Sequence, residues 1–244
     1  MGESALKVSR TEDLIHSIDE KSSVEKIKET HTPELIFVLC GYMGTEIHAV
    51  GEKLKYIIEN EYDYDCEIIK LSKIIEDNKI VTDIKLPTNS SKNYFRAKNL
   101  IHHGNNLREE YGKSILAEIV INKIGLERFE EAESIKADPN ENHHFKPRRR
   151  CFIIDSIKNP HELLILKEVY RNLLYFIGIF SPYKIRESNF KSKDITQKEI
   201  ADLIDQDSHE DIPHGQGVRD TFMYADYFLR IDSSSIAYIE SKLK

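Results

Sequence analysis

The sequence lacks tryptophan altogether and has only three cysteines, with no C-x-x-C pair. The cysteines, Cys40, Cys66 and Cys151, lie in or beside apolar runs, which favours reduced, buried thiols over a disulfide framework. No run approaches the roughly 18 apolar residues of a membrane span, and the first residues lack the apolar core of a signal peptide. We therefore expect a cytoplasmic protein without a membrane partner.

The sequence also lacks an excess of positive charge, because 42 Asp and Glu outnumber 35 Lys and Arg and give a formal net charge of −7. This balance argues against nucleic-acid binding by the whole surface. The cluster Lys146–Arg150 remains a candidate for binding phosphate or RNA, against the more common case of a solvated loop edge. The histidines include two adjacent pairs, His102-His103 and His143-His144, but none has metal-ligand spacing, so we expect no metal site.

The most informative feature is a glycine turn between an expected strand and an expected helix. The apolar run Leu35–Cys40 leads into Gly41-Tyr42-Met43-Gly44-Thr45, and a helical pattern begins near Glu46. Glycines allow a tight turn, and a helix N-terminus presents unpaired N–H groups with a partial positive charge. The layout is that of a phosphate-binding loop.

The side chains of such a loop are missing. Counting the usual Gly-x₄-Gly-Lys-Ser/Thr pattern from Gly41 places Glu46, Ile47 and His48 where glycine, lysine and hydroxyl should stand. Ile47 cannot reach phosphates as lysine does, and His48 lacks the hydroxyl that holds Mg²⁺. The pattern therefore indicates a nucleotide site without its usual chemistry.

The rest of the chain is expected to alternate strands and helices. Residues 1–33 are predicted to be a polar N-terminal arm with a short helix around 11–29, and residues 34–244 the folded domain. Residues 93–129 are predicted to form two helices divided at His103–Asn106, and Ser233–Ser235 is predicted to cap a C-terminal helix. The remaining predicted strands are residues 66–71, 151–155, 174–179 and 227–231.

Two further kinds of residue suggest phosphate chemistry. Asp155 ends an apolar strand, where a carboxylate can hold Mg²⁺ or water, although it could equally cap the following turn. Arginines fork onto phosphate oxygens in phosphoryl-transfer folds, while a surface ion pair is the commoner fate of any single one. The candidates are Arg96, Arg108, Arg186 and Arg219, with Arg186 at the start of the charged stretch 184–211.

Several motifs in order resemble a known family. They are the glycine turn, Gly104–Arg108, Ile153–Glu162, and Asp207–Glu210 through Gly215–Phe222 to Ala225–Phe228. Together they are similar to the N-terminal P-loop kinase-like domain of bacterial anti-phage dCTP deaminases. The resemblance covers about residues 34–244 and is shared in part with small-molecule kinases such as dephospho-CoA kinase.

The resemblance implies an α/β fold of the P-loop NTPase and nucleotide-kinase type, with three layers, a mostly parallel sheet and a helical lid at about 184–217. It implies nucleotide-binding residues Gly41, Gly44, Thr45, Arg108, Asp155, Arg186 and Arg219, and Mg²⁺ bound with the nucleotide. The implied partners are an NTP or dNTP, a deaminase domain, an inhibitory small RNA and further copies of the chain. Zinc would belong only to the deaminase domain, whose H-x-E and P-C-x-x-C motifs are absent here, so the final helix is expected to be a linker towards it.

Three functions are consistent with these features. The first is a nucleotide-sensing, regulatory domain of a deaminase that depletes dCTP during infection. The second is an active nucleotide or deoxynucleotide kinase, which the missing lysine makes less favourable because that group neutralises transition-state charge. The third is an RNA-binding or oligomerisation module whose pocket is vestigial.

Overall fold

The computed structural model describes residues 34–80, 84, 87–136, 149–209, 215 and 217–244. The predicted arm at 1–33, with its helix, the pair His143-His144 and Lys146–Arg148 lie outside these residues. In the described part of the chain no helix has both the length and the apolar character that crossing a membrane requires.

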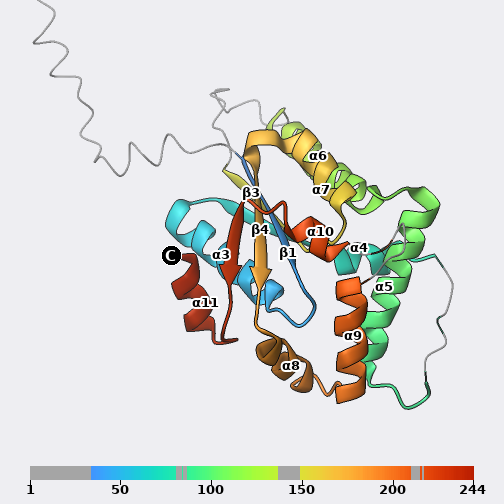
Figure 1. The fold of residues 1–244 in the computed structure, drawn as a ribbon. Coiled ribbons are helices and arrows are strands. Elements are labelled where there is room, and N and C mark those ends of the chain that lie inside the picture. Colours follow the sequence, from blue (N-terminus) through green and yellow to red (C-terminus); the bar gives the residue numbers. More distant parts are fainter. Residues whose placement is uncertain (1–33, 81–83, 85–86, 137–148, 210–214, 216) are drawn as a thin grey trace, which may run out of the picture. The chain divides into compact units, whose positions relative to one another are not determined.

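A parallel sheet of five strands organises the described domain (Figure 1). The strand order is β2-β3-β1-β4-β5, which places β1 at the centre. Apolar side chains fill the central strands, as expected for a sheet covered on both faces. The strands are β1 (Glu34–Gly41), β2 (Asp65–Lys70), β3 (Arg150–Asp155), β4 (Leu174–Phe180) and β5 (Tyr227–Arg230).

Helices pack on both faces of this sheet and form two separate apolar cores. On one face, α3 (Ile47–Tyr62) and α11 (Ile236–Leu243) enclose a core that includes Leu39, Val50 and Ile239. The opposite core includes Phe152 and Phe176. It is covered by α4 (Leu71–Asp77), α5 (Lys92–Tyr111), α6 (Ile115–Lys136), α7 (Pro160–Tyr170) and α10 (Val218–Phe222), with a 3₁₀ turn at Arg171–Leu173 after α7.

A third, smaller core joins α5 to two helices beyond β4. These are α8 (Tyr183–Lys191) and α9 (Gln197–His209), which fall within the predicted lid. Tyr94 and Ile101 of α5 pack there with Phe190, Ile200 and Leu203. This core is separate from the two on the sheet, and α8 and α9 also contact the glycine turn, the loop after β3 and Ser234 through polar side chains.

The α/β fold with a P-loop NTPase-like, all-parallel sheet is confirmed, but one predicted helix boundary is wrong. Residues His103–Asn106 do not divide two helices, since α5 runs through them and the break falls at Gly112. Gly104 is buried inside the helix, where an added Cβ would lie 3.2 Å from the Ile75 side chain. The glycine therefore allows close packing of α4 on α5 rather than a turn.

The last helix packs on the domain. Ile239 of α11 is buried, and Lys53 of α3 pairs with Glu240 at 2.7 Å. Ser235 is the N-cap residue as predicted, but its side chain makes no capping hydrogen bond. Whether α11 also leads into another domain stays a prediction.

Candidate nucleotide site

The glycine turn lies at the carboxyl end of β1, where parallel α/β sheets commonly bind ligands. Gly41 touches the neighbouring strand, because a Cβ there would come within 2.4 Å of the Ile179 carbonyl oxygen. Gly44 has φ +83°, and a Cβ would lie 2.7 Å from the Phe190 ring. The turn closes with the Thr45 N–H donating to the Tyr42 carbonyl oxygen at 3.1 Å. Only glycine suits both positions.

The position of the missing lysine faces the core. Ile47 is the first residue of α3, is buried, and packs with Leu39 and Val50. A side chain at this position therefore points into the core and not towards the cavity. Any cation that faces a bound phosphate must therefore come from another element.

Lys158 supplies such a cation from the loop after β3. Its ammonium lies 2.9 Å from Oδ1 of Asp207, and its side chain lines a cavity beside the turn. The Asp207 carboxylate belongs to α9 and is buried, and its Oδ2 accepts the Met43 N–H at 2.6 Å. The turn, the loop after β3 and α9 thus meet at one carboxylate.

Helix α8 holds the turn from the other side. The Arg186 guanidinium donates to the Met43 carbonyl oxygen at 2.7 Å, and the Asn189 amide donates to the Gly44 carbonyl oxygen at 2.9 Å. Burial lowers the pKa of Arg186, while the nearby Asp207 acts in the opposite direction. Arg186 also stacks over Tyr42, with 5.2 Å from the guanidinium carbon to the ring centre.

Asp155 ends β3 as predicted and lines the same cavity. Its Oδ2 lies 3.2 Å from Nδ1 of His48, and Nε2 of that imidazole lies 3.0 Å from the Lys70 ammonium. Burial raises the pKa of the Asp155 carboxyl, and His48 acts in the opposite direction. The His48 imidazole therefore lies between the Asp155 carboxyl and the Lys70 ammonium, at the place where a P-loop protein has its carboxylate and hydroxyl.

This set of groups does not fit a magnesium site built by the protein. Mg²⁺ prefers oxygen ligands, whereas His48 offers an imidazole nitrogen and Lys70 brings a positive charge to the same place. Within the described ranges, no group of three or more His, Cys, Asp or Glu side chains is arranged to hold a metal ion. Mg²⁺ carried in by a nucleotide stays a prediction.

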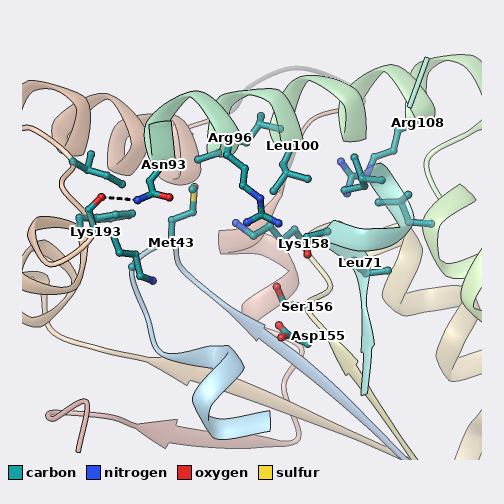
Figure 2. A pocket seen from close by; sticks show the side chains of 18 residues that line it. Met43, Leu71, Asn93, Arg96, Leu100, Arg108, Asp155, Ser156, Lys158 and Lys193 are labelled. Atoms are coloured by element: carbon teal, nitrogen blue, oxygen red, sulfur yellow. Dashed lines mark hydrogen bonds between the residues drawn. The ribbon is translucent and has the colours of Figure 1, made fainter. Parts of the chain in front are cut away.

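The cavity beside the turn has a volume of about 320 Å³ (Figure 2). Arg96, Lys158 and Lys193 give it positive charge, and Asp155 and Ser156 form part of its wall. Figure 2 shows Arg96 reaching into it from α5 and Asp155 at the end of its strand. The apolar lining consists of Leu71, Ile75, Leu100, Ile101, Leu116, Phe190 and Ile195 together with Met43 and Ala97. A pocket of this size, part apolar and part cationic, suits a small phosphorylated ligand.

The structure separates the predicted arginines. Arg186 contacts the turn, whereas Arg108 is buried at the cavity wall in an ion pair of 2.8 Å with Glu162. Arg96 lines the cavity and pairs with Glu76, and Arg219 is exposed on α10 outside the cavity lining. The Thr45 hydroxyl is buried, and no hydrogen-bond partner is found for it among the described residues.

Four residues of the site were not singled out individually from the sequence: Lys158, Asp207, Asn189 and Lys70. Lys158 had a usable signal, since it follows Asp155 by three residues at the carboxyl end of a strand. Asp207 opens one of the motifs that carry the resemblance, but nothing there pointed to the glycine turn, because the N–H that it accepts is 164 residues away in the chain.

The glycine turn at the end of a central parallel strand, flanked by an acid on the next strand, defines a P-loop NTPase-like domain. No protein-family model matches the chain. A UPF0200 protein of Methanothermobacter thermautotrophicus is 27% identical over 128 residues, which are 50% of this chain and 53% of that protein. The chain thus aligns with about half the length of this relative.

A solved structure also resembles the chain. It is an uncharacterized protein from Eubacterium ventriosum, 9% identical, with a match that covers 85% of this chain and 94% of that one. The TM-score is 0.37, which is too low to support any statement about function.

Proposed function

We propose that this domain binds a nucleotide through its phosphates and acts as a sensor rather than as a phosphoryl-transfer enzyme. The observation that carries the proposal is the glycine turn beside a cationic cavity while the lysine position is buried. The Met43 N–H, Lys158 and Arg186 meet at the turn, and in this proposal they attract phosphate oxygens. The distant UPF0200 relative supports a P-loop kinase-like family.

The regulated partner in this proposal is a deoxycytidine nucleotide deaminase, and the process is defence against phage. This part rests on the motif order described above. The nucleotide would report the state of the nucleotide pool to the deaminase domain, which carries its own zinc. The small RNA and further copies of the chain remain partners expected from the same resemblance.

Isothermal titration calorimetry tests the binding step. The folded domain is titrated with dCTP, ATP, dCMP and AMP, with and without Mg²⁺. We expect at least one of them to bind, and Lys158→Gln to weaken it about tenfold or more through loss of a charged hydrogen bond. Lys242→Gln is the matched control, because it removes the same charge from an exposed position of α11 outside the cavity lining. Absence of binding by all four nucleotides would refute the sensing role.

The kinase alternative is less well supported, because Ile47 cannot approach a phosphate from the core. A phosphate-transfer assay with labelled ATP decides it. If the wild-type domain transfers phosphate, Asp155→Asn abolishes that activity and Asp205→Asn preserves it, the domain is a kinase and the sensing role is displaced.

The binding of RNA through Lys146–Arg150 also stays a prediction. Within the described part of this cluster, Arg150 forms ion pairs with Asp65 and Glu127 and therefore has protein partners. Reversal of charge at Arg148, Arg149 and Arg150 tests the cluster, and unchanged RNA binding would exclude it as the contact.

A further inference from the structure

The buried carboxylate of Asp207 lies against the glycine turn. The residue is 1% exposed. One of its oxygens accepts the Met43 N–H at 2.6 Å, and the other accepts from the Lys158 ammonium at 2.9 Å. The Arg186 guanidinium lies 3.7 Å from it. An anion of this chain is therefore held by a backbone N–H and two cations.

These three groups form the kind of receptor that proteins use for phosphate. A backbone N–H of a glycine turn directs a fixed positive dipole at an anion, and lysine and arginine add charge-assisted hydrogen bonds. Carboxylate and phosphate oxygens compete for the same donors because both are hydrogen-bond acceptors with negative charge. Two anions close together repel each other, so one receptor holds one of them at a time.

We propose that Asp207 occupies the phosphate position of the turn and that a phosphate group of the ligand replaces it there. The domain then has two alternative states: in one, the C-terminal part of α9 is docked on the glycine turn, and in the other, phosphate is bound there. The inference rests on the proposed function and adds its regulation: the ligand is recognised by expelling an internal carboxylate. The released helix carries the signal.

The attachment of α9 is suited to such an exchange. Apart from its apolar contacts in the third core, α9 is held to α5 by hydrogen bonds between polar side chains, some of them partly buried. The Tyr94 hydroxyl donates to Asp202 at 2.9 Å, and the Lys98 ammonium donates to Asp202 at 3.0 Å and to Gln206 at 2.6 Å. Asp202 is about half exposed, so water can replace the two contacts of its carboxylate. Loss of the Asp207 contacts would therefore free the end of the helix without opening a core on the sheet.

A comparison of three proteins tests the exchange: the wild-type chain, Asp207→Asn and Asp205→Asn. Asp205→Asn is the matched control because it removes the same charge from an exposed position of the same helix. Each is titrated by calorimetry with sodium tripolyphosphate and with dCTP, both without Mg²⁺. We expect Asp207→Asn to bind tripolyphosphate at least tenfold more tightly than wild type, and Asp205→Asn to remain within about twofold.

Hydrogen exchange in the wild-type chain gives a second readout that needs no variant. Saturating tripolyphosphate should accelerate exchange of the amides of residues 203–207 in α9 and slow that of Met43. This measurement decides the matter even if Asp207→Asn does not fold. Unchanged exchange in α9 with bound tripolyphosphate would overturn the proposal.

The two proposals fail in different ways. If dCTP binds wild type and Asp207→Asn equally, the sensing role stands and the exchange is refuted. If Asp207→Asn binds tripolyphosphate more tightly than wild type does, but binds dCTP no better than it binds tripolyphosphate, the exchange stands and the nucleotide role is refuted. If neither ligand binds any of the three proteins, both proposals are refuted.

Discussion

Two buried acids near the cavity differ in what they hold together. Glu162 of α7 pairs with Arg108 of α5 at 2.8 Å, and both side chains are almost fully buried, at 0% and 2% exposed. Asp207 of α9 meets Lys158 and Arg186, whose side chains remain 17% and 10% exposed. The first pair joins two helices of a core on the sheet, whereas the second joins α9 to the loop after β3 and to α8, beside the hydrogen bond from Met43 of the glycine turn.

The difference in burial separates a structural ion pair from one whose acid can be exchanged. A pair whose two side chains are almost fully buried gives water and dissolved anions little access, so its role is structural. A pair whose cation is partly exposed, as Lys158 is, can exchange its acid for an anion from solution. We therefore read Arg108 as a structural residue at the cavity wall, although its use in phosphate binding stays untested.

The largest expected effect comes from breaking the enclosed pair. Arg108→Met leaves the Glu162 carboxylate buried without its cation, and we expect a loss of about 3–5 kcal/mol in the free energy of unfolding. Urea denaturation followed by circular dichroism measures it. The control is Arg96→Met, whose pair with Glu76 is exposed and should contribute about 0–1 kcal/mol. Equal losses in both variants would contradict the structural reading of Arg108.

The contact between the turn and α8 gives the next effect. Gly44→Ala places a methyl group 2.7 Å from the Phe190 ring at a positive φ, and we expect a loss of about 2–3 kcal/mol. Gly125→Ala is a matched control within α6, where nothing lies within 4 Å. That control should raise stability by up to about 1 kcal/mol, since alanine favours helix. A loss from Gly125→Ala, or none from Gly44→Ala, would argue against this packing.

Removal of the exchangeable acid should destabilise less than removal of Arg108. Asp207→Asn keeps a polar group on the Met43 N–H, and water can reach Lys158 and Arg186, so we expect a loss of about 1–2 kcal/mol. The same urea experiment measures it. A loss as large as that of Arg108→Met would make Asp207 a fixed structural acid like Glu162 and would remove the contrast between the two.

The smallest effect concerns a third acid, Asp155, and depends on pH. Burial raises its folded pKa above the unfolded value of about 3.9, so the folded state holds the proton more tightly. Stability is then lost as pH rises from about 4 through the folded pKa. Asp155→Asn lacks this loss, so its melting temperature should rise relative to wild type between pH 4 and pH 8.

The groups that face Asp155 supply the control for this pH experiment. His48 and Lys70 favour the carboxylate, while Glu52 disfavours it. In a His48→Gln background, the difference in melting temperature that Asp155→Asn causes should therefore widen. A difference that stays constant over the whole pH range would show that the titration of Asp155 does not affect folding.

Local patterns predicted much of the fold. The alternation of apolar runs and helical periodicity located the five strands of the sheet and placed the glycine turn after the first of them, which the sheet then put at its centre. Gly104 misled the helix prediction, because a glycine that ends a helix and one that admits a neighbouring side chain look alike in sequence. Only the packing of Ile75 distinguishes them.

By itself, the sequence determined the α/β fold, the turn at residues 41–45, the acid at the end of β3 and the absence of a lysine from the loop. These features depend on neighbours within a few positions of each other. The tertiary structure alone decided that Ile47 faces the core, that Arg108 is enclosed by Glu162, and that Asp207 reaches Met43 across 164 residues. The reason is that burial and long-range ion pairing depend on which elements pack together, and spacing along the chain carries no record of that.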